Sequence, residues 1–156
     1  MADKYHDTVA KSTVLTDDEK VKADVAEILA KELEGNRTHD VFKFLFNCID
    51  LTTLKATDSP QSVARFTERV NDFEQEHGDL PNVAAICVYP NFAPIVRTVL
   101  DVTEVNIACV AGGFPSSQTF PEVKVAEVAL AVEGGADEID IVLNVGNFLD
   151  GDWEEV

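Results

Sequence analysis

Gly135-Ala-Asp-Glu-Ile-Asp-Ile-Val-Leu-Asn144 is the stretch that decides the fold. It is typical of a short, nearly all-apolar strand, with the carboxylate of Asp140 set into its middle. An ionised carboxylate that is buried without partners is costly, so such a group is normally hydrogen-bonded, shifted in pKa or functional. The stretch therefore predicts a strand covered on both faces, as in a parallel sheet, with Asp140 as a candidate functional residue.

Three further apolar runs precede this strand, and a helical pattern separates each run from the next. Ser59-Pro60 marks one helix start clearly, because serine caps a helix and proline suits its first turn. This alternation is typical of βαβ units that build a parallel sheet. The predicted strands are 47–53, 83–89, 105–110 and 138–144, and the predicted intervening helices are 59–77, 93–100 and 119–133. In the last helix, Val123, Ala126, Val128, Ala129, Leu130 and Val132 are expected to face mostly inward.

The two ends of the chain differ from this pattern. Residues 1–46 predict a helical extension, with a capping box at Thr16-Asp-Asp-Glu19, an apolar stripe, and Gly35 as the stop signal. Residues 47–156 form the predicted α/β domain. After its fourth strand we expect a turn over 147–151 and a new helix from Asp152, cut after one turn, so the chain is expected to be a fragment.

Composition limits the classes of partner. The 156 residues carry a net charge of -17, which disfavours binding to nucleic acid or to anionic membranes. The N-terminus lacks the apolar core of a signal peptide and no segment is long enough to span a bilayer, so we expect a cytoplasmic protein. Cys48, Cys87 and Cys109 lack the spacing of a zinc set and are expected to be reduced.

Polar residues gather where the predicted strands end, which is where parallel α/β barrels place their active sites. Asp140 is interpreted as a general acid or base, with a structural carboxylate as the alternative. Asp50 with Thr52 either lines a site or anchors a loop, and Cys87 either packs or lines the same site. Gly112-Gly113 allows close approach of a ligand or makes only a turn. The histidines lie too far apart for a metal site, and none is assigned: His6, His39 and His77.

Four of these segments together resemble deoxyribose-phosphate aldolases, which are Schiff-base-forming class I enzymes built on a (βα)8 barrel. The segments that carry the resemblance are Ile49-Asp-Leu-Thr-Thr-Leu54, Val83-Ala-Ala-Ile-Cys-Val-Tyr-Pro90, Gly113-Phe-Pro115 and Gly135–Gly146. Their order and spacing match over roughly residues 45–156. The fold expected from the resemblance is an α/β half-barrel of the TIM type, the N-terminal half, with four parallel strands after the helical extension.

The resemblance implies retro-aldol cleavage of 2-deoxy-D-ribose 5-phosphate to glyceraldehyde 3-phosphate and acetaldehyde, without a cofactor. It assigns proton transfer, through a bound water, to Asp140, and the lining of the substrate pocket to Asp50, Thr52 and Cys87. In the family a lysine on strand six forms the imine and a second on strand seven lowers its pKa. Both strands lie beyond this chain, so the Schiff-base lysine is expected to be absent. The lysines present are Lys4, Lys11, Lys20, Lys22, Lys31, Lys43, Lys55 and Lys124.

Two consequences follow from a half-barrel. The 156-residue chain by itself is expected to be inactive. Strands one and four would have unpaired backbone groups, so we expect self-association or pairing with the missing C-terminal half through these edges. Two other interpretations stay open: another Schiff-base phosphosugar aldolase of the same superfamily, and a non-catalytic half-barrel that serves as an interaction module.

Overall fold

The computed structural model describes residues 5–11 and 17–156, which fall into two compact units, Met1–Phe42 and Lys43–Val156. The first unit holds α1 (His6–Lys11), α2 (Asp18–Glu32) and the start of α3 (His39–Phe46). Thr16, the predicted cap, lies outside the described residues, and the side chain that caps α2 is that of Asp17, which accepts from the backbone N–H of Glu19 and Lys20.

The apolar stripe of α2 is exposed. None of its residues is buried, and its surface carries ion pairs between neighbouring turns, such as Lys20 with Asp24 at 2.6 Å. Exposed pairs of this kind stabilise a helix by only about 0.3–0.5 kcal/mol each. The apolar residues concerned are Val21, Val25, Ile28, Leu29 and Leu33. Among the described residues, no helix is long and apolar enough to cross a membrane.

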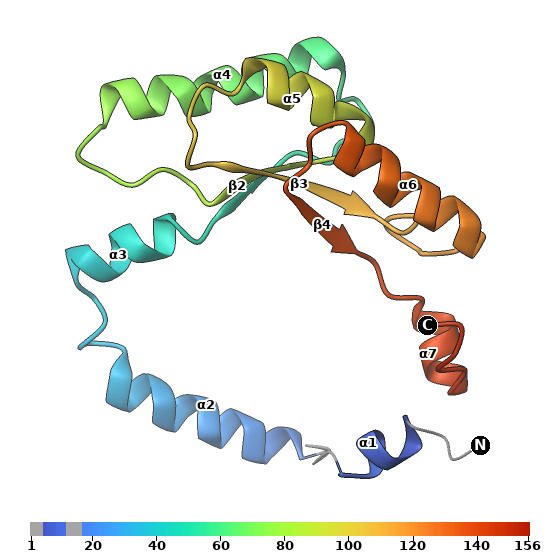
Figure 1. Ribbon diagram of the computed structural model, residues 1–156. Coiled ribbons are helices and arrows are strands. Elements are labelled where there is room, and N and C mark those ends of the chain that lie inside the picture. The colour runs from blue at the N-terminus through green and yellow to red at the C-terminus, as the bar shows by residue number, and fades with distance from the viewer. Residues whose placement is uncertain (1–4, 12–16) are drawn as a thin grey trace. The chain divides into compact units, whose positions relative to one another are not determined.

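The second unit contains the predicted parallel sheet. Four strands lie side by side in chain order, each parallel to the next (Figure 1). The sequence therefore correctly predicted the parallel sheet and the order of its four strands and of the helices between them. Its elements, after α3, are β1 (Asp50–Thr52), α4 (Pro60–Glu76), β2 (Ala85–Val88), the 3-10 turn η1 (Pro90–Phe92), α5 (Ala93–Val99), β3 (Asn106–Ala111), α6 (Pro121–Glu133), β4 (Glu138–Ile141) and α7 (Val145–Asp150).

The main core lies between the sheet and helices α4, α5 and α6, which cover one face of it (Figure 1). Helix α4 begins as predicted, with Ser59 accepting a hydrogen bond from the backbone N–H of Ser62. Its residues Val63 and Val70 are buried against the sheet, while Ile86 and Ile107 from β2 and β3 are fully buried beneath the helices. We call this covered side of the sheet the outer face.

The opposite side, the inner face, carries a second and smaller cluster. Its buried members are small side chains from the two central strands: Ala85, Cys87, Ala108 and Val110. No helix of the described residues 43–156 contributes to this cluster. The central strands β2 and β3 are thus buried on both faces, as predicted, whereas β1 and β4 form exposed edges.

Three sequence predictions about the C-terminal part were wrong. In α6 only Ala131 is buried and Val128 half-buried, while Val123, Leu130 and Val132 are exposed. Apolar residues occur all around this helix, so their spacing does not mark a face. The predicted turn over 147–151 is instead α7.

Local signals explain the position of α7. The Asn144 side chain caps its start by accepting from the N–H of Asn147, and Gly151 ends it at φ +73°. This left-handed conformation is one that glycine adopts without the penalty of a Cβ atom. Residues 153–155 form a turn rather than the predicted helix start.

Candidate functional site

Strand register brings the candidate site residues onto one face of the sheet. Thr52 pairs with Cys87, and Cys87 pairs with Ala108 of the small inner-face cluster. Asp140 pairs with Val110, another member of that cluster. Registered partners on parallel strands point to the same side, and residues two apart on one strand do so as well. Asp50 therefore shares the inner face with Thr52, Cys87 and Asp140.

Cys87 lies at the centre of this group. Burial raises the pKa of its thiol, a hydrogen bond with the Thr52 side chain partly offsets the rise, and the negative charges of Asp140 and Asp50 add to it. Both carboxylates therefore lie close enough to Cys87 to affect its ionisation. At neutral pH the thiol is neutral, which suits a residue that lines a site better than a nucleophile.

Asp140 is exposed, which differs from the burial that its apolar surroundings in the sequence suggested. The reason is its strand. β4 is an edge of the sheet, so only β3 shields it, and the residue after Asp140, Ile141, is itself 67% exposed. A second carboxylate, that of Glu138, lies on the same face and accepts a hydrogen bond of 2.6 Å from the side-chain amide of Asn106.

The inner face is therefore acidic. Asp50, Glu138 and Asp140 contribute carboxylates, and the four strands contain no lysine or arginine. Such a face would favour a cationic group placed opposite it, because a positive charge near several carboxylates is attracted by all of them. Sequence reasoning did not single out Glu138 or Asn106, because the pairing of these two side chains depends on the register of β3 with β4.

The loop after β3 is anchored by a residue that sequence reasoning missed. The Glu127 carboxylate, on α6, accepts hydrogen bonds from the backbone N–H of Gly112 at 2.8 Å and of Gly113 at 3.0 Å. Of the two interpretations of the glycine pair, this favours the turn, because both N–H groups are already bound within the protein. The only sequence signal was a glutamate among the apolar residues in the middle of this helix.

The first residues of the stretch Gly135–Asn144 hold strand β4 in place. Asp137 accepts hydrogen bonds from the Arg97 guanidinium at 2.6 Å and from the Ile107 N–H at 2.9 Å, so it links α5, β3 and β4. Arg97 also donates to the Gly135 carbonyl oxygen. The two aspartates of this motif thus differ: Asp137 holds the strand in place, and Asp140 faces the candidate site.

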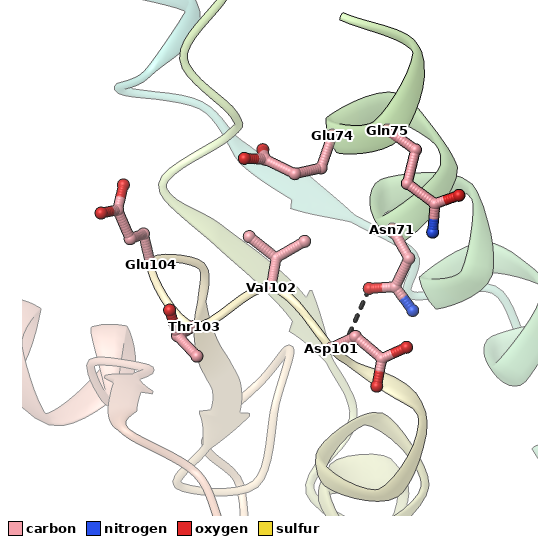
Figure 2. Close-up of a pocket in the computed structure, with 7 residues that line it drawn as sticks. All are labelled: Asn71, Glu74, Gln75, Asp101, Val102, Thr103 and Glu104. Atoms are coloured by element: carbon pink, nitrogen blue, oxygen red, sulfur yellow. Dashed lines mark hydrogen bonds between the residues drawn. The ribbon is translucent and has the colours of Figure 1, made fainter. Parts of the chain in front are cut away.

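A separate pocket of about 340 Å³ lies between α4 and the segment that leads into β3 (Figure 2). Asn71 of α4 bridges to the segment before β3 there, accepting from the Asp101 N–H at 3.0 Å and donating to the Val99 carbonyl at 2.8 Å. The segment 101–104 precedes β3, so the pocket adjoins the N-terminal ends of the strands. In parallel α/β barrels the N-terminal ends of the strands serve stability rather than chemistry. Within the described part of the chain, no group of three or more metal-ligating side chains is suited to a metal ion.

Parallel βα units in chain order, with polar residues on the uncovered face toward the strand ends, define a partial TIM-type barrel. No family model matches the chain. The curated deoxyribose-phosphate aldolase of Deinococcus radiodurans is 38% identical over 112 residues, which are 72% of this chain and 47% of that protein. The human deoxyribose-phosphate aldolase is 37% identical over 116 residues, covering 68% of this chain and 36% of that protein.

Solved structures give the same result. An aldolase named QR15 aligns with a TM-score of 0.61 and 28% identity, over 76% of this chain and 47% of that one. The deoxyribose phosphate aldolase of Aeropyrum pernix, described as a tetramer, has the same fold with a TM-score of 0.59. The chain is similar over about 70% of its length to deoxyribose-phosphate aldolases and shares their fold, and it spans less than half the length of the curated relatives it matches.

Proposed function

We propose that this chain supplies the N-terminal half of a deoxyribose-phosphate aldolase site, which cleaves 2-deoxy-D-ribose 5-phosphate to glyceraldehyde 3-phosphate and acetaldehyde. One observation carries the proposal: Asp50, Thr52 and Asp140 surround Cys87 on the inner face. These are the positions to which the family resemblance assigns the substrate pocket and proton transfer. No cofactor is part of the proposal.

In this reaction Asp140 moves protons. Retro-aldol cleavage requires removal of the proton from the hydroxyl on the carbon that becomes the new aldehyde. A carboxylate acting through a water molecule is a suitable base, and it can return the proton to the carbon left behind. Exposure on an edge strand leaves room for that water and for a sugar. Thr52 and Asp50 offer hydrogen-bonding groups to hydroxyls, and the neutral Cys87 offers a small apolar contact.

The imine-forming lysine would come from outside these four strands. Its ammonium group, and that of the neighbouring lysine of the family pattern, would face the acidic inner face formed by Asp50, Glu138 and Asp140. Of the lysines in this chain, Lys55 is the one that follows a strand end most closely. It is exposed and belongs to the loop after β1.

The chain alone is therefore proposed to be inactive. The test is reduction with borohydride in the presence of 2-deoxy-D-ribose 5-phosphate, followed by intact mass measurement. No adduct is expected on this chain, and a covalent adduct on it would refute the proposal. The matched positive arm adds the C-terminal half of a related aldolase, where an adduct is expected on the added half.

Activity in that reconstituted mixture tests the role of Asp140. Asp140→Asn is expected to lower the turnover number by about 10²–10⁴-fold, the usual contribution of a general acid or base. Glu104→Gln, at the N-terminal ends of the strands, is the matched control and should leave turnover unchanged. Cleavage of a different phosphosugar with none of the deoxyribose phosphate would favour the second aldolase interpretation. Binding without any cleavage would favour the interaction module.

Pairing through the sheet edges belongs to the same proposal. β1 and β4 each have one neighbouring strand, so each leaves a row of backbone N–H and C=O groups without a strand partner. We propose that a second copy or a complementary half pairs there. Sedimentation at micromolar concentration tests this: a monomer whose edge-strand amides are fully protected from exchange would refute it. The three cysteines are free thiols, which fits the proposed cytoplasmic location.

A further inference from the structure

Phe114 is the part of the loop after β3 that reaches the inner face. Its ring packs against the small cluster that contains Cys87, and it contacts the Tyr89 ring edge-on, with the centroids 6.2 Å apart. Phe114 follows directly after the Gly112-Gly113 pair. The conformation of these two glycines therefore decides where the aromatic ring lies relative to Cys87.

Glu127, on helix α6, binds the backbone of the glycine pair. Gly112 and Gly113 have φ of +83° and +76°, which turns their two successive N–H groups toward one point. A single oxygen, Oε2 of Glu127, occupies that point and accepts from both groups. Glu127 is half-buried on the side of α6 that also carries the buried Ala131. A charged acceptor with limited access to water makes short, strong hydrogen bonds.

We propose that Glu127 is a positioning residue of the site, which fixes the loop so that Phe114 forms a wall beside Cys87. The importance of Glu127 for catalysis rests on the proposed function, whereas the geometry of the loop does not. It also assigns the glycine N–H groups to an internal carboxylate. The phosphate of a sugar substrate is therefore bound by other groups.

The backbone amides of Gly112 and Gly113 test this in the isotope-labelled chain by NMR. In the unchanged chain both amide protons are expected to exchange slowly with solvent, because both are hydrogen-bonded to Glu127. Glu127→Gln is expected to keep this protection and the contact between the Phe114 and Tyr89 rings, because the amide oxygen still accepts both hydrogen bonds. Fast exchange of both amides in the unchanged chain would overturn the proposal.

Reactivity of Cys87 connects the loop to the site. Glu127→Ala is expected to remove the contact between the Phe114 and Tyr89 rings and to speed Cys87 alkylation by at least about threefold, since the wall no longer covers the thiol. Glu127→Gln should react at the rate of the unchanged chain, and so should the control Glu133→Ala, an exposed position on the same helix. Equal rates in all four proteins, or equal acceleration by Ala and Gln, would refute a positioning role.

These measurements separate the two proposals. They use the 156-residue chain and need no activity, so a reconstituted enzyme that proves inactive leaves them valid. If Glu127→Ala does not fold, the exchange of the Gly112 and Gly113 amides in the unchanged chain and in Glu127→Gln still decides the outcome. If the amides respond as expected while the reconstituted enzyme has no aldolase activity, the proposed function fails and the positioning of the loop stands.

Discussion

Gly135→Ala is expected to destabilise the protein, and the structure gives the size of the effect. Gly135 has φ +103°, a conformation that costs an alanine roughly 1–3 kcal/mol. A Cβ atom placed there would lie 3.1 Å from Cγ and from Nε of Arg97, which is too close. Arg97 must then move, and its hydrogen bonds to the Gly135 carbonyl and to Asp137 are weakened. Both side chains of that ion pair are exposed, so its loss adds only about 0–1 kcal/mol.

The expected total is a loss of about 1–4 kcal/mol in the free energy of unfolding. Urea unfolding followed by circular dichroism measures it, and a midpoint lower by roughly 1–2 M is expected for a small domain. Gly78→Ala is the matched control. Its added Cβ would meet the Glu74 carbonyl oxygen at 3.5 Å, an ordinary contact, and its φ is not in the left-handed region. It should change stability by no more than about 0.5 kcal/mol.

A double-mutant cycle with Arg97→Ala separates the two causes. If crowding of Arg97 contributes, Gly135→Ala should cost about 1 kcal/mol less in the Arg97→Ala background than in the unchanged protein. The same cost in both backgrounds would refute the crowding argument and leave the backbone conformation as the sole cause. A cost equal to that of Gly78→Ala would refute the reasoning as a whole.

Three further perturbations have expected outcomes. Burial, with a smaller contribution from Cys87, raises the pKa of Cys109 to about 11, so between about pH 9 and 11 the unfolded state loses a proton that the native state keeps. The unfolding free energy should therefore fall by about 2–3 kcal/mol over that range, and Cys109→Ala should abolish this part of the slope. Ser117 has φ +57° and a fully buried hydroxyl without a described partner. Ser117→Gly should therefore raise the unfolding free energy by about 1–2 kcal/mol. Ser117→Ala should raise it less, because it removes only the hydroxyl and keeps the Cβ atom. Asp140→Asn should lower the Cys87 pKa and speed its alkylation at pH 8, whereas Thr52→Val should slow it, both followed by mass spectrometry; no change in either variant would contradict the geometry of the site.

Local signals in the sequence were enough for much of the fold. The Ser59-Pro60 start of α4 and the apolar runs of β2 and β3 act over a few residues, so their outcome does not depend on distant contacts. The predicted inward face of α6 was wrong because apolar residues occur on all sides of that helix. Only packing against the sheet selects Val128 and Ala131 from among them.

The candidate site shows the same division. That Asp50, Thr52, Cys87 and Asp140 come near the ends of strands is visible in the sequence. They share one face because Thr52 is in register with Cys87 and Asp140 with Val110, and this register cannot be read from the sequence. Glu127 could not be assigned a role in advance, since its partners lie 14 and 15 residues away along the chain.

The stretch from Gly135 to Asn144 thus determined by itself that a strand forms there and that a carboxylate interrupts it, and together with three other segments it determined which family the chain resembles. Only the tertiary structure decided what each residue in it does. Asp137 holds the strand because Arg97 and the Ile107 N–H come within hydrogen-bonding distance of it. Asp140 is exposed because β4 lies at an edge of the sheet. Burial and pairing are set by neighbours that are distant in the chain, and a local pattern of residues contains no information on where those neighbours lie.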